Sequence, residues 1–214
     1  MHISFFLLPL FAVFSASQDL SIPTELTTGF TSSTNLVLTF GSNELTNGQV
    51  VPLATTRTAP TFALGDSDGI NTNANYIIVC IDPDAPAPAS QVLHFLGTDF
   101  SPAPGIGTNL TSDVEPALEY MPPGPPEGTG PHRYIWLLYR QPRGFTIQNV
   151  PTNRTGFDVE AWRVGNALGE AVAGTFFVAE FGGEYAGMWW LVVLGANGDR
   201  WWGRIELDGE WRRC

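Results

Sequence analysis

Cysteine and histidine are rare in this chain, which restricts the kinds of site it can build. Only two cysteines and three histidines occur among 214 residues, and no CxxC or HExxH pattern is present. Zinc sites depend on such spacings, so we expect neither a metal ion nor another cofactor. Cys80 lies within an apolar run typical of a buried strand, whereas Cys214 is the last residue. A disulfide would join a buried position to a chain end, so the sequence favours a free, buried thiol at Cys80.

Positive charge is also scarce. Lys and Arg together number 10, against 21 for Asp and Glu, which gives a formal net charge of -11 at pH 7. A chain this acidic is repelled by phosphate backbones and by anionic lipid surfaces, which excludes non-specific binding to nucleic acid or to membranes. Any anion that the protein binds must therefore be held by local hydrogen-bond donors.

Long apolar runs are missing beyond the first residues, and the first run is short. Ser4 to Phe14 is almost wholly apolar and is followed by the small residues Ser15-Ala16-Ser17. Such a run is too short to span a bilayer, but an apolar core followed by small residues is typical of a signal peptide. We therefore expect residues 1–17 to be removed during secretion, leaving an extracellular protein with no transmembrane segment. A buried N-terminal strand or an interfacial anchor is the alternative.

Two Asn-X-Thr triplets agree with secretion. They begin at Asn109 and Asn153. In a secreted protein such triplets accept N-linked glycans and lie on the surface. We expect a mature chain that starts at residue 18, forms one domain over residues 18–180, and carries a glycan on Asn109, Asn153 or both.

The body of the chain has the pattern of a mostly β protein. Short runs rich in β-branched and aromatic residues alternate with glycine- and proline-rich turns. The predicted strands are 36–40, 50–53, 76–81, 92–96, 134–139 and 175–179. One helix is predicted to begin after Asp158, which can cap it, and to end at Gly169.

The chemically most informative residues lie in two rigid loops at strand ends. Asp82-Pro83-Asp84-Ala85-Pro86 follows the run 76–81, and His94 lies within the next predicted strand. The segment 124–134 reads Gly-Pro-Pro-Glu-Gly-Thr-Gly-Pro-His-Arg-Tyr and enters the run 134–139. Prolines restrict both loops, so together they can form a small fixed site of carboxylate, imidazole and backbone groups.

This combination resembles the phosphatidylethanolamine-binding protein family, whose two motifs read much like DPDAP…H and GPP-x-GTG-x-HRY. The resemblance extends over residues 20–180. It implies a mostly β fold of two antiparallel sheets, one large and one smaller, with a few peripheral helices and an anion site at one end. It also implies a cis bond before Pro86. The residues at the positions of the family's site are Asp82, Asp84, Pro86, His94, Gly124, His132 and Tyr134.

The resemblance implies a binding protein and not an enzyme. Its ligand would be a small anion or a phospholipid head group such as phosphatidylethanolamine, and the family includes inhibitors of a serine carboxypeptidase. Both imidazoles are expected to donate hydrogen bonds to the anion, with His132 contributing most. A hydrolase that uses Asp82, His94 and His132 is one alternative, although no Gly-x-Ser-x-Gly elbow occurs. A non-catalytic secreted protein with a vestigial site is the other.

Purely structural roles are an alternative interpretation of the same side chains. His132 could tie its loop to a strand, and His94 could be a satisfied core residue. Asp82 and Asp84 could form Asx-turns ahead of the prolines. Arg133 is expected to form a structural ion pair and not to contact a ligand. The loop between Asp84 and His94 is shorter than is typical of the family, which predicts an altered or more open rim.

The tail, residues 181–214, departs from the family pattern. Five of the seven tryptophans lie in it, at positions 189, 190, 201, 202 and 211. Ala196-Asn197-Gly198-Asp199 has the composition of a hairpin turn, so one interpretation is a C-terminal hairpin. The other is a terminus that does not belong to the fold. No site residue is placed on it.

Overall fold

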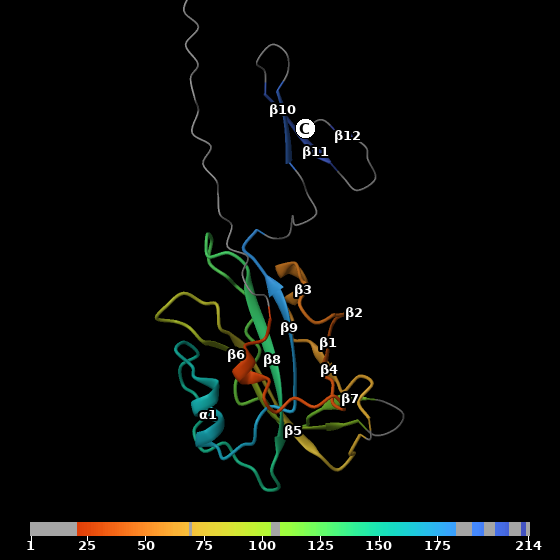
Figure 1. The fold of residues 1–214 in the computed structure, drawn as a ribbon, viewed down its shortest axis with the longest axis vertical. Helices are drawn as coiled ribbons and strands as arrows, with labels where there is room; N and C mark the ends of the chain where they lie inside the picture. Colours follow the sequence, from red (N-terminus) through yellow and green to blue (C-terminus); the bar gives the residue numbers. More distant parts are fainter. Residues whose placement is uncertain are drawn as a thin grey trace, which may run out of the picture.

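The structure is a computed structural model that describes residues 21–68, 70–103 and 108–182, together with the backbone of three later strands (Figure 1). The predicted signal peptide and Cys214 lie outside these residues. The described chain is mostly β, as expected. It has one α-helix, α1 (Val159–Gly165), and two short 3-10 helices, η1 (Thr24–Leu26) and η2 (Leu53–Thr56). No helix in the described ranges is long and apolar enough to cross a membrane.

Nine strands form one curled sheet. Its spatial order is β2 (Asn43–Glu44), β1 (Val37–Phe40), β4 (Thr61–Ala63), β7 (Asn109–Thr111), β6 (Val92–Pro102), β5 (Asn75–Asp82), β8 (His132–Gln141), β9 (Ala173–Ala179) and β3 (Gln49–Val50). Neighbouring strands are antiparallel, apart from the parallel pair β3–β9.

The two antiparallel sheets expected from the family are therefore halves of a single mixed sheet. Strand β6 joins them, because it pairs with β5 over most of its length and with β7 at Ser101 and Pro102. The β5–β6 register shifts twice, and Asp99 has a φ of 60°. Such irregularities bend a strand, which allows β6 to belong to both halves.

Strand β5 is buried on both faces, which explains its unbroken apolar run. Ile78 and Cys80 pack into the cluster inside the curl of the sheet, whereas Ile77, Val79 and Ile81 pack on the opposite face, under α1. Successive side chains of a strand point to opposite faces, so a strand covered on both sides must be apolar at every position. Cys80 is a free, buried thiol, and burial raises its pKa well above the usual value.

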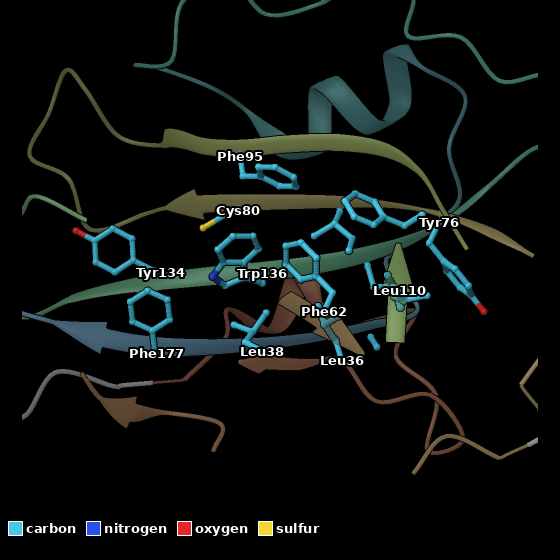
Figure 2. Close-up of a cluster of buried hydrophobic side chains, with 14 of the residues drawn as sticks. Leu36, Leu38, Phe62, Tyr76, Cys80, Phe95, Leu110, Tyr134, Trp136 and Phe177 are labelled. Carbon is cyan, nitrogen blue, oxygen red and sulfur yellow. The ribbon is translucent and has the colours of Figure 1, made fainter. Parts of the chain in front are cut away.

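Aromatic rings fill the curl of the sheet. Figure 2 shows Trp136 at the centre of this cluster, with Tyr134 near one end and Tyr76 at the other. Trp136 is fully buried, with ring centroids 5.3 Å from Phe62 and 5.7 Å from Phe95. Edge-on and tilted contacts of this kind stabilise a core beyond the burial of area alone. The cluster therefore supports the ends of the strands from which the predicted site residues extend.

Helix α1 begins as predicted and ends earlier than predicted. The Asp158 side chain accepts a hydrogen bond of 2.9 Å from the Ala161 amide, which satisfies an amide that the first turn leaves free. The helix stops at Gly165, since Asn166 turns its side chain back onto the Trp162 carbonyl and Ala167 has a φ of 54°. A left-handed residue terminates a helix whatever follows it, so Gly169 is not the end.

Other predictions from local pattern are confirmed only in part. Five of the six predicted strands correspond to β1, β5, β6, β8 and β9. The sixth, 50–53, contributes only Val50 to a strand and then continues into η2. The sequence analysis did not predict β2, β4 and β7, which have two or three residues each and too little periodicity to be recognised.

The tail contains a separate three-stranded sheet. β10 (Trp190–Leu194) pairs antiparallel with β11 (Arg200–Ile205), and β11 pairs with β12 (Trp211–Arg212). The first pair agrees with the hairpin interpretation, since Leu194 lies opposite Arg200. The predicted turn residues 196–199 lie outside the described residues.

Candidate functional site

The two predicted loops meet at one end of the sheet because of the strand directions. β5 ends at Asp82, while its antiparallel neighbours β8 and β6 begin at His132 and Val92. The end of a strand lies beside the start of an antiparallel neighbour. Residues separated by 50 positions, Asp82 and His132, are thereby brought into direct contact.

These strand ends surround a cavity of about 240 Å³. Six of the seven predicted site residues line it, namely Asp82, Pro86, His94, Gly124, His132 and Tyr134. Pro126, one of the prolines expected to form a stiff wall, also lines it, whereas the sequence analysis missed Ala85, Ala89, Val92, Met121 and Pro122. They supply mostly apolar walls and carry no chemical signature of their own. A cavity of this size suits a head group or small anion better than a drug-sized ligand.

Asp82 holds two parts of the cavity wall in place through hydrogen bonds. Its side chain is buried, and Oδ2 lies 2.8 Å from Nδ1 of His132. Oδ1 accepts hydrogen bonds from the backbone amides of Asp84, at 2.8 Å, and Ala85, at 3.1 Å. The Asx-turn considered above is thus present, together with the carboxylate–imidazole contact. One carboxylate therefore fixes both the loop and the histidine.

His132 has a protein partner at each ring nitrogen. Nδ1 donates to Asp82, and Nε2 lies 2.8 Å from the Thr129 hydroxyl, which is also 2.7 Å from the Pro126 carbonyl. The single hydroxyl proton is shared between these two acceptors. The ring is only 1% exposed. This arrangement differs from our expectation that His132 is the main hydrogen-bond donor to a ligand. Its nitrogens are used to hold the loop 126–132 against β5.

His94 is the imidazole that has only one ring nitrogen in a hydrogen bond within the described residues. Nδ1 lies 2.7 Å from the Met121 carbonyl and must donate, because a carbonyl only accepts. Nε2 makes no hydrogen bond within the described part of the chain. Burial lowers the pKa of His94 below its usual value, against opposing effects of the Met121 carbonyl and Asp82. At neutral pH the ring is therefore uncharged, and Nε2 presents a lone pair.

Tyr134 and Gly124 complete the polar lining. The Tyr134 ring meets His94 edge-on, with centroids 5.0 Å apart. Burial raises the pKa of the Tyr134 hydroxyl, Asp82 acts in the same direction, and the Gly124 backbone amide opposes them through a hydrogen bond. The hydroxyl therefore stays protonated and can donate. A Cβ built at Gly124 meets no atom within 4 Å, so the backbone there is open to a ligand.

Asp84 is the predicted site residue that the structure does not bring into the cavity. Its carboxylate receives two side-chain hydrogen bonds from Arg133, at 2.8 and 2.7 Å, and one from the Arg133 amide at 2.8 Å. The Arg133 side chain also donates to the Ser21 carbonyl. Burial by itself raises the pKa of Asp84, but the Arg133 hydrogen bonds and charge outweigh it and hold the pKa below the usual value. The expected structural ion pair of Arg133 is thus confirmed.

Arg154 is a supporting residue that the sequence analysis missed. Its guanidinium donates to the carbonyls of Leu93, His94 and Glu119 at 3.1, 3.2 and 2.7 Å. It thereby joins the start of β6 to the segment that carries Met121. Arg154 is the middle residue of the glycosylation triplet that begins at Asn153, and nothing in the neighbouring sequence predicts its contacts with these carbonyls. Both triplet asparagines, Asn109 and Asn153, are exposed.

The cis proline bond of the first loop lies one proline later than expected. It precedes Pro88, and the bond before Pro86 is not cis. Both are Ala-Pro bonds, so the local sequence does not distinguish them.

Comparison with known proteins identifies the family. The family model for phosphatidylethanolamine-binding protein matches residues 41–177, which include every predicted ligand-binding residue. The chain belongs to this family. The match ends at Phe177, within β9, and does not include the separate sheet β10–β12.

Two solved structures and one curated protein illustrate what the chain is similar to. A carboxypeptidase Y inhibitor, solved in complex with its cognate proteinase, is 26% identical with a TM-score of 0.56, over 69% of this chain and 83% of that one. A Plasmodium vivax phosphatidylethanolamine-binding protein shares the fold at 18% identity, with a TM-score of 0.54 over 68% and 84% of the two chains. An uncharacterized Saccharomyces cerevisiae protein is 31% identical over 48% of this chain. The match spans about half of that relative, 55% of its length.

Proposed function

We propose that this protein binds a small ligand bearing a phosphate or similar oxyanion, such as a phospholipid head group, in the cavity beside His94. The observation that carries the proposal is the convergence of six predicted residues on one cavity of about 240 Å³. The apolar walls exclude water, which strengthens the few polar contacts inside. Tyr134 supplies a hydroxyl donor, and His94 supplies a nitrogen that accepts or donates according to its protonation.

A binding role fits the geometry better than hydrolysis. Asp82, His132 and Thr129 follow one another at 2.8 and 2.8 Å, the order of a carboxylate–imidazole–hydroxyl triad. However, Thr129 does not line the cavity, and the Pro126 carbonyl, 2.7 Å from its hydroxyl, competes with His132 for its proton. A nucleophile has to reach the bound substrate and pass its proton to the imidazole. The chain of hydrogen bonds therefore acts as a structural support.

The test is to obstruct the cavity without disturbing the fold. At Gly124 the backbone is not left-handed and a Cβ has free space, so we expect Gly124→Phe to fold normally and to place a ring at the cavity rim. Phosphorylethanolamine, measured by calorimetry, should bind the native protein saturably and bind Gly124→Phe at least about tenfold more weakly. Gly165→Phe is the matched control, because this exposed glycine of α1 also has free space around its Cβ.

Two results would count against this proposal. Equal affinity in Gly124→Phe would place the ligand elsewhere or favour the vestigial interpretation. Release of inorganic phosphate from phosphorylethanolamine, followed by phosphorus NMR, would favour the hydrolase, and it should then disappear in Thr129→Val.

We further propose that the protein inhibits or modulates a serine carboxypeptidase. The support is its similarity to the carboxypeptidase Y inhibitor over most of both chains. The purified protein should slow hydrolysis of a peptide substrate by such an enzyme in a saturable manner. Unchanged hydrolysis at a large excess of the protein would remove this role and leave ligand binding untouched.

Secretion is the remaining part of the proposal. It rests on the apolar run and small residues of positions 4–17 and on the exposure of Asn109 and Asn153. Protein isolated from its host should begin near Gln18 and lose mass on treatment with a glycosidase. Soluble protein that retains Met1 and carries no glycan would show that the export prediction is wrong.

A further inference from the structure

A second and larger cavity lies at the opposite end of β8 from His132. Its volume is about 430 Å³, and it is bounded by the loop that precedes β5 and the turn that follows β8. The lining includes Asn73, Asn75, Asp99, Arg140 and Arg143. In contrast to the His94 cavity, its walls are rich in amide and guanidinium groups.

The one carboxylate in this lining is satisfied by neutral donors. Asp99 accepts hydrogen bonds from the side chains of Gln141, Thr98 and Asn75, at 2.5, 2.8 and 3.5 Å. The Asp99 amide in turn donates to the Gln141 side chain at 2.8 Å. No ion pair joins Asp99 to an arginine in the described residues. The two arginines of the cavity are therefore not neutralised by it.

Neither arginine has an anionic partner within the described residues, and an aromatic ring orients one of them. The Arg140 guanidinium carbon lies 5.7 Å from the centre of the buried Tyr76 ring, a cation–π contact that orients the side chain. Arg143 lies in a tight turn closed by a 3.2 Å hydrogen bond from the Phe145 amide to the Pro142 carbonyl. Gly144, with a φ of 68°, permits this turn.

The other arginines of the described domain are mostly occupied. Arg133 and Arg163 pair with carboxylates, and Arg154 binds three backbone carbonyls. The sequence contains no lysine, and the net charge is -11. Two unpaired guanidinium groups on one concave surface therefore form a local positive field within an acidic protein. Guanidinium groups bind carboxylate and phosphate oxygens in pairs, which gives both strength and orientation.

We propose that the cavity between Arg140 and Arg143 is a second binding site that takes a small oxyanion, a carboxylate or a phosphate. The guanidinium groups bind the charged oxygens, and the exposed Asn73 side chain is close enough in the lining to bind a neighbouring hydroxyl or carbonyl group. The site is independent of the His94 cavity, because the two lie at opposite ends of β8.

The test follows backbone amide resonances during titration with succinate and, separately, with inorganic phosphate. In the native protein the Gly144 and Asn73 amides should shift saturably, and the ligand with the tighter of the two titrations identifies the preferred oxyanion. Arg140→Gln with Arg143→Gln should weaken this titration at least about tenfold. The control is Arg57→Gln, an exposed arginine outside this lining, which should leave it unchanged.

Three results would overturn the assignment. The first is the absence of a saturable shift with either ligand. The second is an unchanged titration in the double variant, and the third is an equal loss in Arg57→Gln, which would reveal a general charge effect. Shifts of Gly124 report on the His94 cavity, so failure at one site is distinguishable from failure at the other.

Discussion

Asp82→Ala is expected to destabilise the protein by about 3 kcal/mol or more, because one buried and two partly buried hydrogen-bond donors lose their acceptor. These donors are Nδ1 of His132 and the amides of Asp84 and Ala85. The change also releases the two loops that form the cavity. Urea denaturation of the native and variant proteins measures the free energy of unfolding.

Two further variants make this prediction specific. In Asp82→Asn the amide oxygen still accepts from the loop, and the other tautomer of His132 accepts from the Asn amide at Nδ1 and donates from Nε2 to Thr129, whose proton then goes to the Pro126 carbonyl. The cost should therefore be clearly smaller, on the order of 1 kcal/mol. Asp113→Ala removes an exposed carboxylate that makes no hydrogen bond in the described residues and should change stability by less than about 0.5 kcal/mol. A cost for Asp82→Ala no greater than that for Asp113→Ala would contradict the supporting role of Asp82.

Sulfate affinity at the His94 cavity should rise at least about tenfold between about pH 7.5 and pH 5. Sulfate has only acceptor oxygens in this range, and neutral His94 presents a lone pair at Nε2. Burial lowers the pKa of His94, so the ring gains its proton only below the usual histidine range. Once protonated, Nε2 donates a charge-assisted hydrogen bond to the anion. Calorimetry at several pH values measures the effect.

The variant His94→Gln separates this mechanism from others. Glutamine both donates and accepts without titrating, so the pH dependence should become nearly flat. The measurements use protein that also carries Arg140→Gln and Arg143→Gln, so that sulfate binding at the second cavity does not contribute to the measured affinity. Protonation of His94 also destabilises the free fold, since its pKa is lower in the folded state. This destabilisation is absent above about pH 6.5 and grows as the pH falls. Melting curves must therefore show that the protein is folded at each pH. A steep profile that persists in His94→Gln would assign the titration to another group.

The strands predicted correctly are those whose residues are buried in a regular pattern. β5 and β8 are covered on both faces and lie at the centre of the sheet, so their middle positions, 76–81 and 134–139, are all apolar and the runs are visible in the sequence. β4 and β7 have three residues each, and their place in the sheet depends on pairing with distant partners. The early end of α1 has a different reason, since it follows from the local backbone of Asn166 and Ala167 and not from the apolar pattern.

The residues that line the cavity were largely predictable, but their hydrogen-bond partners were not. The two motifs named Asp82, His94, His132, Gly124 and Tyr134 correctly as neighbours, and all of them line one cavity. Asp84 belongs to the same motif, yet its carboxylate is bound by Arg133. A motif shows which residues occur together, whereas the direction of each side chain depends on the partner that the fold offers it.

The sequence by itself determined a mostly β domain of this family, two rigid loops at strand ends and a strongly acidic chain. These features are local or compositional: alternating burial, restricted proline backbone and summed charge are all encoded within a few residues of one another. The tertiary structure alone decided that His132 is saturated by Asp82 and Thr129, that His94 keeps Nε2 free, and that Arg140 and Arg143 share a cavity. Each of these depends on the register between strands distant in the chain, and a shift of one residue would direct the same side chains to the other face of the sheet.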